Sequence, residues 1–499
     1  MSVQPRPPYS EAELQKLYPS TLRLEQVQVL MRHGERTPVG ARFANAGVPT
    51  YWPYCSAMSR MRSAIHDPAT QSFTELDWRR HLETFGADDV PVPATSSSQG
   101  LDNLCDMGML TDRGRETTHA LGTRLRDLYI DKLRFLPAHI SSTDDLYLRS
   151  TPVPRALESM QQAFHGLYPP SHRAPSLPPP TIISRTFADE TLLPNEANCR
   201  RFVQLARAYA QRAADRWNDS DDMAFLNARL SKYMPEDSPR VAVDAKPRIT
   251  GIMDSTNATD AHGPLTKLPR EFYEPRVRRT VEKIGVDEWF AGYKENNEYR
   301  TLGIGGLLGD IVARMVASAE AARAGGSGGG GGSGAGKSPV RFGLSGCHDT
   351  TLAAALTSLG AYNTEAWPPF TSHIALELFS KPEQAATAAP SSSASSWLPS
   401  FLGGGKSSAG IGRKPTSKLT DDEKETIKGY YVRLRYNDMP VSIPGCKAEG
   451  KHLDGDESFC TLEAFKSVVD KFTPQNWKQQ CRSNLKESAF PTKPTPAGY

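Results

Sequence analysis

The chain has 499 residues, which is long enough for one large α/β domain with an inserted subdomain or for two to three separate domains. Its 59 basic and 56 acidic residues give a formal net charge of +3, so bulk charge does not predict binding to nucleic acid or to a membrane surface. Any preference for anions must therefore come from a local cluster of cations.

A buried strand followed by a charged turn is predicted near the N-terminus. Residues 27–30, VQVL, are rich in apolar and β-branched types, and a turn follows at His33 and Gly34. Ligands bind at the carboxyl ends of strands in open α/β sheets, so Arg32, His33 and Arg36 are expected to line a binding site. Two guanidinium groups beside one imidazole favour phosphate, although R-H-G alone is also compatible with an ordinary basic loop.

Two separated motifs carry a family resemblance. Residues 32–38 read R-H-G-x-R-x-P, which resembles the signature of the histidine acid phosphatases, the second branch of the histidine phosphatase superfamily. Residues 342–352, FGLSGCHDTTL, are an apolar strand-like run ending in His348 and Asp349, and they resemble the second signature of that family. The resemblance implies an α/β fold with a mixed central sheet flanked by helices and an inserted, mainly helical cap subdomain.

The helix predicted after the first signature covers residues 110–129. Thr111 can cap its N-terminus, Gly114 permits close packing, and leucines recur at helical spacing. The segment resembles the L-T-x-x-G helix of the family, so we expect it to pack on the sheet rather than to touch substrate.

Residues 146–169 read as a strand, a turn and an amphipathic helix, and they resemble the family segment R-S-T-x-x-x-R. The resemblance implies that Arg155 reaches the phosphate, whereas Arg149 buttresses the turn. Pro152 and Pro154 stand where the family commonly has acidic residues, which leaves loop geometry and substrate choice open.

A long insertion follows and is predicted to be mostly helical. Because a long crossover in an α/β enzyme commonly becomes a lid, we expect this segment to cover the site; the alternative is a helical subdomain without substrate contact. After the second signature, residues 367–379 resemble a further family pattern, in which Glu377 orients a neighbouring group in the core and His373 is structural. The predicted helices of the insertion are 199–217, 221–233, 276–297 and 305–324.

Two segments have a composition typical of flexible chain. Residues 325–337 are glycine-rich, and residues 381–417 are rich in Ala, Ser, Gly and Pro. Within the second, Trp397 to Leu402 contain an apolar island that would dock a partner or a membrane, or fold back on its own domain. The predicted division is a polar lead-in (1–22), a phosphatase core (23–169 and 338–480), a helical cap (170–324), a linker (325–337) and a disordered insertion (381–417).

Seven cysteines, few and odd in number, do not look like a disulfide framework, so we expect buried thiols, with Cys446 and Cys460 as a pair that could still form. Residues 1–20 lack a basic segment followed by an apolar core, which predicts an intracellular protein, cytoplasmic rather than mitochondrial. No membrane span is predicted, because the most apolar stretch, residues 302–316, is broken by Asp310 and Arg314.

The expected chemistry needs neither a cofactor nor a metal. The chain has no C-x-x-C and no H-E-x-x-H motif. The resemblance implies that His33 is the nucleophile and Asp349 the general acid, whose proton is kept in the substrate complex by a nearby phosphate dianion and partial burial. The residues expected to hold the phosphate are Arg32, Arg36, Arg155 and His348.

The predicted function is hydrolysis of phosphate monoesters through a phosphohistidine, with lysophosphatidate as one candidate substrate. The terminal segments are more similar to the intracellular lysophosphatidic acid phosphatase-like branch than to secreted phytases. The alternatives are a phytase-like or broad-specificity phosphatase, a phosphoglycerate-mutase-like enzyme and a non-catalytic binding protein. The spacing of Arg32 and Arg36, and Asp349 directly after His348, favour the phosphatase over the mutase. No nucleic-acid partner is expected.

Overall fold

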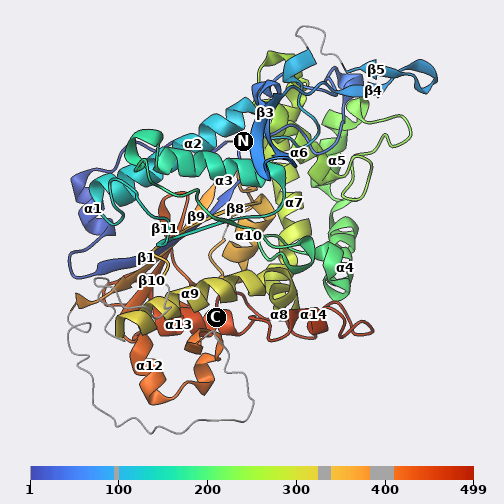
Figure 1. Cartoon of the computed structure of the whole chain (residues 1–499). Coiled ribbons are helices and arrows are strands. Elements are labelled where there is room, and N and C mark those ends of the chain that lie inside the picture. The colour runs from blue at the N-terminus through green and yellow to red at the C-terminus, as the bar shows by residue number, and fades with distance from the viewer. Residues whose placement is uncertain (1, 95–100, 324–338, 363, 383–409) are drawn as a thin grey trace.

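A mixed β-sheet forms the centre of the computed structural model, which describes residues 2–94, 101–323, 339–362, 364–382 and 410–499 (Figure 1). The central strand β1 (Arg23–Arg32) pairs in parallel with β8 (Phe342–Cys347) and antiparallel with β9 (His373–Ser380). β6 (Leu146–Ser150) continues the parallel half beside β8. The strand order of the described sheet is β12-β13-β10-β9-β1-β8-β6-β7, with β11 beside β10.

The remaining strands of this sheet lie at its two edges. β7 (Ile182–Ile183) pairs in parallel with β6, and the other strands are antiparallel to their neighbours. The mixed sheet predicted from the sequence is therefore confirmed. The antiparallel strands beyond β9 are β10 (Tyr430–Tyr436), β11 (Met439–Val441), β12 (His452–Leu453) and β13 (Asp456–Thr461).

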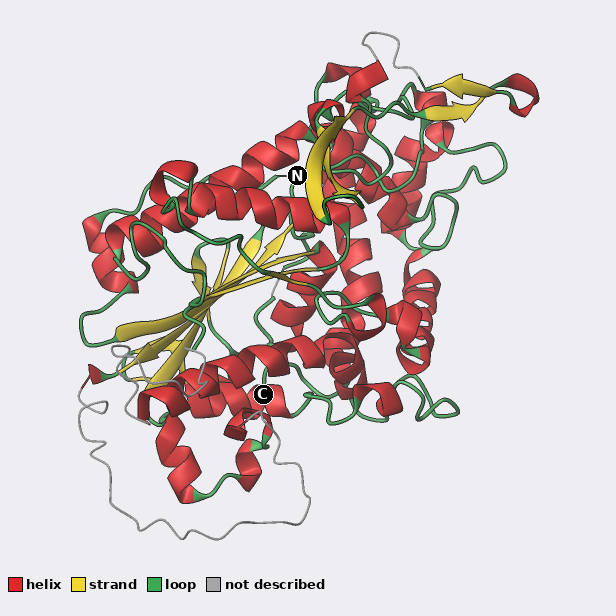
Figure 2. Cartoon of the chain, viewed as in Figure 1, coloured by secondary structure: helices red, strands yellow, loops and turns green. Residues whose placement is uncertain are grey.

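Helices cover both faces of the sheet, as Figure 2 shows. On one face α2 (Asp112–Arg126) and α3 (Pro154–Leu167) pack against each other and share a hydrophobic core with Val27 and Val29 of β1. The opposite face is covered by α9 (Gly306–Arg323), α10 (Asp349–Ser358) and α13 (Leu462–Asp470). Strand alternation explains this division, because successive residues of β1 point to opposite sides.

The helical insertion is divided between two places. Four longer helices lie beside the carboxyl edge of the sheet, whereas α9, at the end of the predicted cap, packs under β1. Helix α6 was not predicted from the sequence, because its polar residues Ser255, Thr256 and Asn257 are buried and obscure a helical stripe. The helices beside the edge are α4 (Arg200–Trp217), α5 (Asp221–Leu230), α6 (Ile249–Asp260) and α7 (Pro275–Glu295), followed by the short α8 (Asn297–Arg300).

Two β-ribbons occupy a region that the sequence predicted to be long loops. β2 (Met61–Asp67) pairs with β3 (Ser72–Trp78), and β4 (Glu83–Phe85) with β5 (Pro91–Pro93). Both ribbons are exposed on both faces, so their strands lack the buried apolar positions from which a strand is usually recognised.

The predicted lead-in and insertion contain ordered structure. The lead-in forms α1 (Glu11–Leu17), which Ser10 caps. Most of the predicted disordered insertion, including the Trp397 to Leu402 island, lies outside the described residues, as does the whole glycine-rich linker. At its C-terminal end the structure differs from the prediction, because Gly410–Arg413 packs on α9 and Arg413 forms an ion pair with Asp310. Apart from α13, the last helices of the chain are α12 (Asp421–Ile427) and α14 (Trp477–Gln480).

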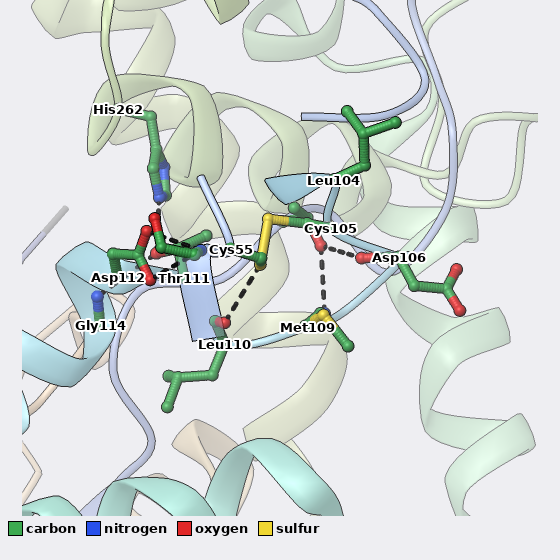
Figure 3. The surroundings of a disulfide bond; sticks show 12 residues. Cys55, Leu104, Cys105, Asp106, Met109, Leu110, Thr111, Asp112, Gly114 and His262 are labelled. Carbon is green, nitrogen blue, oxygen red and sulfur yellow. Dashed lines mark hydrogen bonds between the residues drawn. A yellow bond between two sulfur atoms is a disulfide. The ribbon is translucent and has the colours of Figure 1, made fainter. Parts of the chain in front are cut away.

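The prediction of mainly reduced cysteines was wrong, since six of the seven cysteines form disulfides in the structure. The partners of two bridges lie 50 and 282 residues apart, so pairing follows from the fold and not from local spacing. Figure 3 shows one of them beside Leu110 and Thr111, where α2 begins. The bridges join Cys55 to Cys105, Cys199 to Cys481 and Cys446 to Cys460, and Cys347 is a buried free thiol.

Glu377 in β9 organises a buried polar cluster, in agreement with its predicted role in the core. Its carboxylate lies 2.7 Å from Arg433 and 3.3 Å from Arg435, and it accepts hydrogen bonds from Tyr18 and Tyr129 at 2.6 and 2.8 Å. Burial alone would raise the pKa of Glu377, but the two arginines outweigh it and lower that pKa. The cluster joins β9 and β10 to the N-terminal segment and to the helical turn Asp127–Lys132, which follows α2.

One helical stretch within the described residues, Asn297–Arg323, is long and apolar enough to cross a membrane by length and composition. It is mostly buried inside the protein, and its α9 part contacts β1.

Candidate active site

The predicted site residues meet at one edge of the sheet. β1, β8 and β6 are parallel neighbours, so their carboxyl ends lie together and carry His33, His348 and the turn into α3. The rings of His33 and His348 have centroids 5.6 Å apart, and Arg32 lies 2.8 Å from Asp349. The structure therefore brings residues from the two signatures into one cluster.

His33 is oriented for reaction at one of its two ring nitrogens. The backbone amide of His33 donates to the Cys347 carbonyl at 3.0 Å. Its ring atom Nδ1 lies 2.9 Å from the carbonyl oxygen of the next residue, Gly34. A carbonyl can only accept, so Nδ1 carries the hydrogen and Nε2 of the neutral ring holds the lone pair. Burial, followed by the charges of Arg155 and Arg36, holds the pKa of His33 well below its ordinary value. The neutral imidazole therefore persists to a lower pH than in a solvent-exposed histidine.

Two glycines allow α2 to approach the turn after β1. A Cβ on Gly34 would lie 2.3 Å from the carbonyl oxygen of Gly114, which is closer than two such atoms can come. Thr111 caps α2, as predicted, by accepting a hydrogen bond from the Gly114 amide at 3.3 Å. The Gly34 amide donates to Ser159 of α3 at 3.0 Å. The turn is thus held by both helices of this face.

Three arginines surround His33 and have donors to spare. The guanidinium of Arg32 lies 4.1 Å from the ring centroid of Phe370, and that of Arg155 donates to the Gly108 carbonyl at 3.4 Å. In the described part of the chain, the Nε atoms of Arg32, Arg36 and Arg155 are buried without a hydrogen-bond partner. Burial lowers the pKa of Arg155 only to about 10, so its charge persists at neutral pH. Buried unpaired donors of this kind fit a ligand with several acceptor oxygens.

Asp349 is ionised in the substrate-free site. Its carboxylate accepts the indole hydrogen bond of Trp367 at 2.9 Å and faces Arg32. Burial would raise the pKa of Asp349, but the Arg32 charge and the Trp367 hydrogen bond lower it. The expectation of a retained proton therefore applies only to a complex in which phosphate engages Arg32. The neighbouring His348 lies 3.1 Å from the Thr151 hydroxyl, and burial together with Arg155 lowers its pKa.

Asp254 of α6 belongs to the site and was not found from the sequence. Its carboxylate lies 2.7 Å from Arg36 and 3.0 Å from Arg42, and accepts the Val39 amide hydrogen bond at 3.0 Å. An Asp in a segment without a clear helical stripe gives no sequence signal of this role. Its position shows that the inserted helices do reach the site.

Two predicted structural residues lie outside this cluster. Arg149 is fully buried and pairs with Glu190 at 2.6 Å, which holds the segment after β7 beside β6. His373 lies 3.3 Å from the Asp438 carboxylate at the start of β9. No group of three or more His, Cys, Asp or Glu side chains in the described residues is arranged to hold a metal ion.

The chain is similar in sequence to known phosphatases. A family described as "Histidine phosphatase superfamily (branch 2)" matches residues 23–437. A probable acid phosphatase of Schizosaccharomyces pombe is 34% identical over 483 residues, covering 93% of this chain and 95% of the relative. Human lysophosphatidic acid phosphatase type 6 is 25% identical, covering 72% and 74% of the two chains.

Solved structures show the same fold at lower sequence similarity. The apo form of Hafnia alvei phytase superposes with a TM-score of 0.54 at 14% identity, covering 93% of this chain and 99% of the phytase. This likeness concerns the arrangement of the sheet and helices.

Proposed function

The chain belongs to branch 2 of the histidine phosphatase superfamily and is an acid phosphatase of phosphate monoesters; within that activity we propose that His33 is the nucleophile. The observation that carries this assignment is the hydrogen bond from Nδ1 of His33 to the Gly34 carbonyl. It leaves the Nε2 lone pair free on a ring whose neutral form is favoured first by burial and then by the charges of three arginines.

The proposed reaction has two displacements. Nε2 of His33 attacks phosphorus, the ester P–O bond breaks, and Asp349 gives its proton to the leaving alkoxide. A water molecule then attacks the phosphohistidine, passes a proton to the Asp349 carboxylate, and the P–N bond breaks to release phosphate. Arg32, Arg36, Arg155 and His348 stabilise the equatorial oxygens in both steps without a metal, so we expect activity to survive EDTA.

Asp349 would gain its proton as substrate binds. In the free site the Arg32 guanidinium stabilises the carboxylate form. A phosphate dianion bound to Arg32 weakens that stabilisation and adds a nearby negative charge, and both effects raise the pKa of Asp349. Substrate binding and protonation of the general acid are therefore coupled.

We further propose a substrate with a single phosphate, such as lysophosphatidate, rather than an inositol polyphosphate. The charges of Arg32, Arg36 and Arg42 are already balanced in part by Asp349 and Asp254. The remaining positive charge suits one phosphate group, whereas a ring of phosphates needs several uncompensated cations. The relative active on lysophosphatidic acid supports the same choice.

The substrate proposal is tested by comparing kcat/KM for 1-oleoyl-lysophosphatidate, myo-inositol hexakisphosphate and 4-nitrophenyl phosphate, each with and without EDTA. We expect kcat/KM for lysophosphatidate to exceed that for the inositol phosphate at least tenfold, with no effect of EDTA. Faster hydrolysis of the inositol phosphate would support the phytase-like alternative instead. His33→Ala is the control for contaminating phosphatases.

The intracellular location stays a proposal. The three disulfides are evidence against a reducing compartment such as the cytoplasm. An oxidising compartment, inside the cell or outside it, is compatible with these bridges. Fractionation of cells producing the full protein, with the thiol state measured in each fraction, decides between a reducing and an oxidising compartment.

A further inference from the structure

A second cavity lies between the N-terminal segment and the C-terminal half of α2. It has a volume of about 160 Å³, and residues 6–9 form one of its walls. Its apolar lining includes Tyr9, Leu121, Leu125 and Leu128. The cavity is separate from the phosphate site: Gly114, which contacts the turn at Gly34, precedes Arg124 of the cavity by ten residues, or about 15 Å along a helix.

Arg124 is the uncompensated charge of this cavity. Its guanidinium forms no hydrogen bond or ion pair with any described residue, and its Nε is buried. The other lining cation, Arg6, is bound to both oxygens of Glu13 at 2.6 and 2.7 Å. A half-buried guanidinium without a hydrogen-bond partner has lost part of its hydration, and only longer-range attractions to Asp438 and Tyr9 offset that loss. It therefore favours an anion inside the cavity.

The carboxylates that line the cavity do not pair with Arg124. Asp438 accepts the Tyr9 hydroxyl hydrogen bond at 3.2 Å and lies 3.3 Å from His373 and 3.7 Å from Arg435. Its charge reaches Arg124 only as a longer-range attraction. The other lining carboxylate, Asp127, lies 4.0 Å from Lys132. Two fixed negative charges beside one open cation favour a monoanion over a dianion, because each added charge on the ligand is repelled.

We propose that this cavity binds a small carboxylate with an apolar body, of about the size of benzoate. Its carboxylate would accept two hydrogen bonds from the fork of Arg124, and its ring would lie against Tyr9 and the leucines of α2. The size agrees, because a protein cavity of about 150 Å³ accommodates benzene. This site is independent of the hydrolytic reaction.

The proposal is tested by calorimetric titration of benzoate into the full-length protein in the presence of saturating inorganic phosphate, which occupies the catalytic site. We expect Arg124→Met to raise the Kd for benzoate at least tenfold. Arg113→Met is the matched control, because Arg113 lies on the same helix, is exposed and pairs with Glu116, and its Kd should equal that of the wild type. Benzamide, which has the same shape without the charge, should bind at least tenfold more weakly than benzoate.

Three results would overturn the proposal: no binding of benzoate at millimolar concentration, equal binding by Arg124→Met, or displacement of benzoate by added phosphate. Unchanged hydrolysis of 4-nitrophenyl phosphate by Arg124→Met shows that the variant is folded. If that variant does not fold, the comparison of benzoate with benzamide on the wild type tests the charge, and equal binding of the two would overturn the proposal. Arg124→Lys tests the fork of donors, because lysine keeps the positive charge and loses the planar guanidinium.

Discussion

The Asp349 carboxylate lies 2.8 Å from the Arg32 guanidinium, so the predicted general acid and a predicted phosphate ligand are joined in an ion pair. The pair links the end of β1 to the start of α10, and it keeps Asp349 ionised while the site is empty. A substrate phosphate competes with Asp349 for the same guanidinium, so the ion pair must weaken before Asp349 can hold a proton.

Replacing Asp349 by Asn should cripple hydrolysis of alkyl phosphates and spare aryl phosphates. An alkoxide is a poor leaving group and needs a proton in the transition state, whereas an aryloxide leaves without much help. We expect kcat to fall about 100-fold or more with an alkyl ester and much less with 4-nitrophenyl phosphate. Equal losses for the two substrates would exclude the general-acid role.

His348→Ala serves as the contrast to that variant. If His348 stabilises charge on the phosphoryl group, both substrate types should slow by similar factors, because that charge is common to them. A loss confined to alkyl esters would assign proton donation to His348 instead.

The acid limb of the pH profile should depend on Arg155. Its positive charge lowers the pKa of His33, so removal of that charge stabilises the imidazolium and raises that pKa. On lowering the pH, His33 of Arg155→Met should therefore become protonated, and lose its reactive neutral form, at a higher pH than in the wild type. The acid limb of kcat/KM, measured with 4-nitrophenyl phosphate, should move upward relative to wild type and to Arg113→Met. An unmoved limb would contradict this electrostatic account.

The two signature motifs are short and local, and they allowed the cluster of candidate site residues to be predicted from the sequence. Each signature contains a strand and its adjacent turn, so His33 and His348 needed only parallel neighbouring strands to meet. The caps and the close glycine contact at Gly114 also follow from local chemistry. For this reason the strands β1, β6 and β8, most long helices and the clustering of the six predicted site residues could be anticipated from the sequence.

Features that depend on distant parts of the chain could not be predicted. Asp254 becomes part of the site only because α6 is placed beside Arg36, 218 positions earlier in the chain. The pairing of Cys199 with Cys481 likewise requires the three-dimensional fold. The exposed ribbon β2–β3 has no buried face and therefore no apolar alternation from which to infer it.

Glu377→Gln should destabilise the protein by about 3–5 kcal/mol, because it removes the charge that compensates two buried arginines. In the wild type this contribution is present above the unfolded pKa of 4.5 and is lost as pH falls through the lowered pKa of the folded state. Denaturant unfolding at neutral pH measures the change. Glu457→Gln, at an exposed pair 3.7 Å from Lys447, is the control and should change stability by less than about 1 kcal/mol. Similar values for the two variants would contradict the role of the cluster.

Thiol counting tests the corrected cysteine assignment. Without reductant, the denatured protein should react with one equivalent of a maleimide, at Cys347, and after reduction with seven. Cys347→Ser should give none before reduction. Seven reactive thiols in the untreated protein would restore the original expectation of reduced cysteines. If the bridges are present, their reduction should also lower the thermal midpoint, because the Cys199–Cys481 bridge closes a very long loop.

The central claim is that the phosphoryl group passes through His33, and trapping that intermediate tests it most directly. Rapid quenching of Asp349→Asn during turnover of 4-nitrophenyl phosphate, followed by peptide mass spectrometry, should place a phosphoryl group on His33. The label should be stable to alkali and lost in acid, as expected of a phosphohistidine. His33→Ala should carry no label and show no turnover. A label on another residue, or wild-type kcat in His33→Ala, would contradict the account.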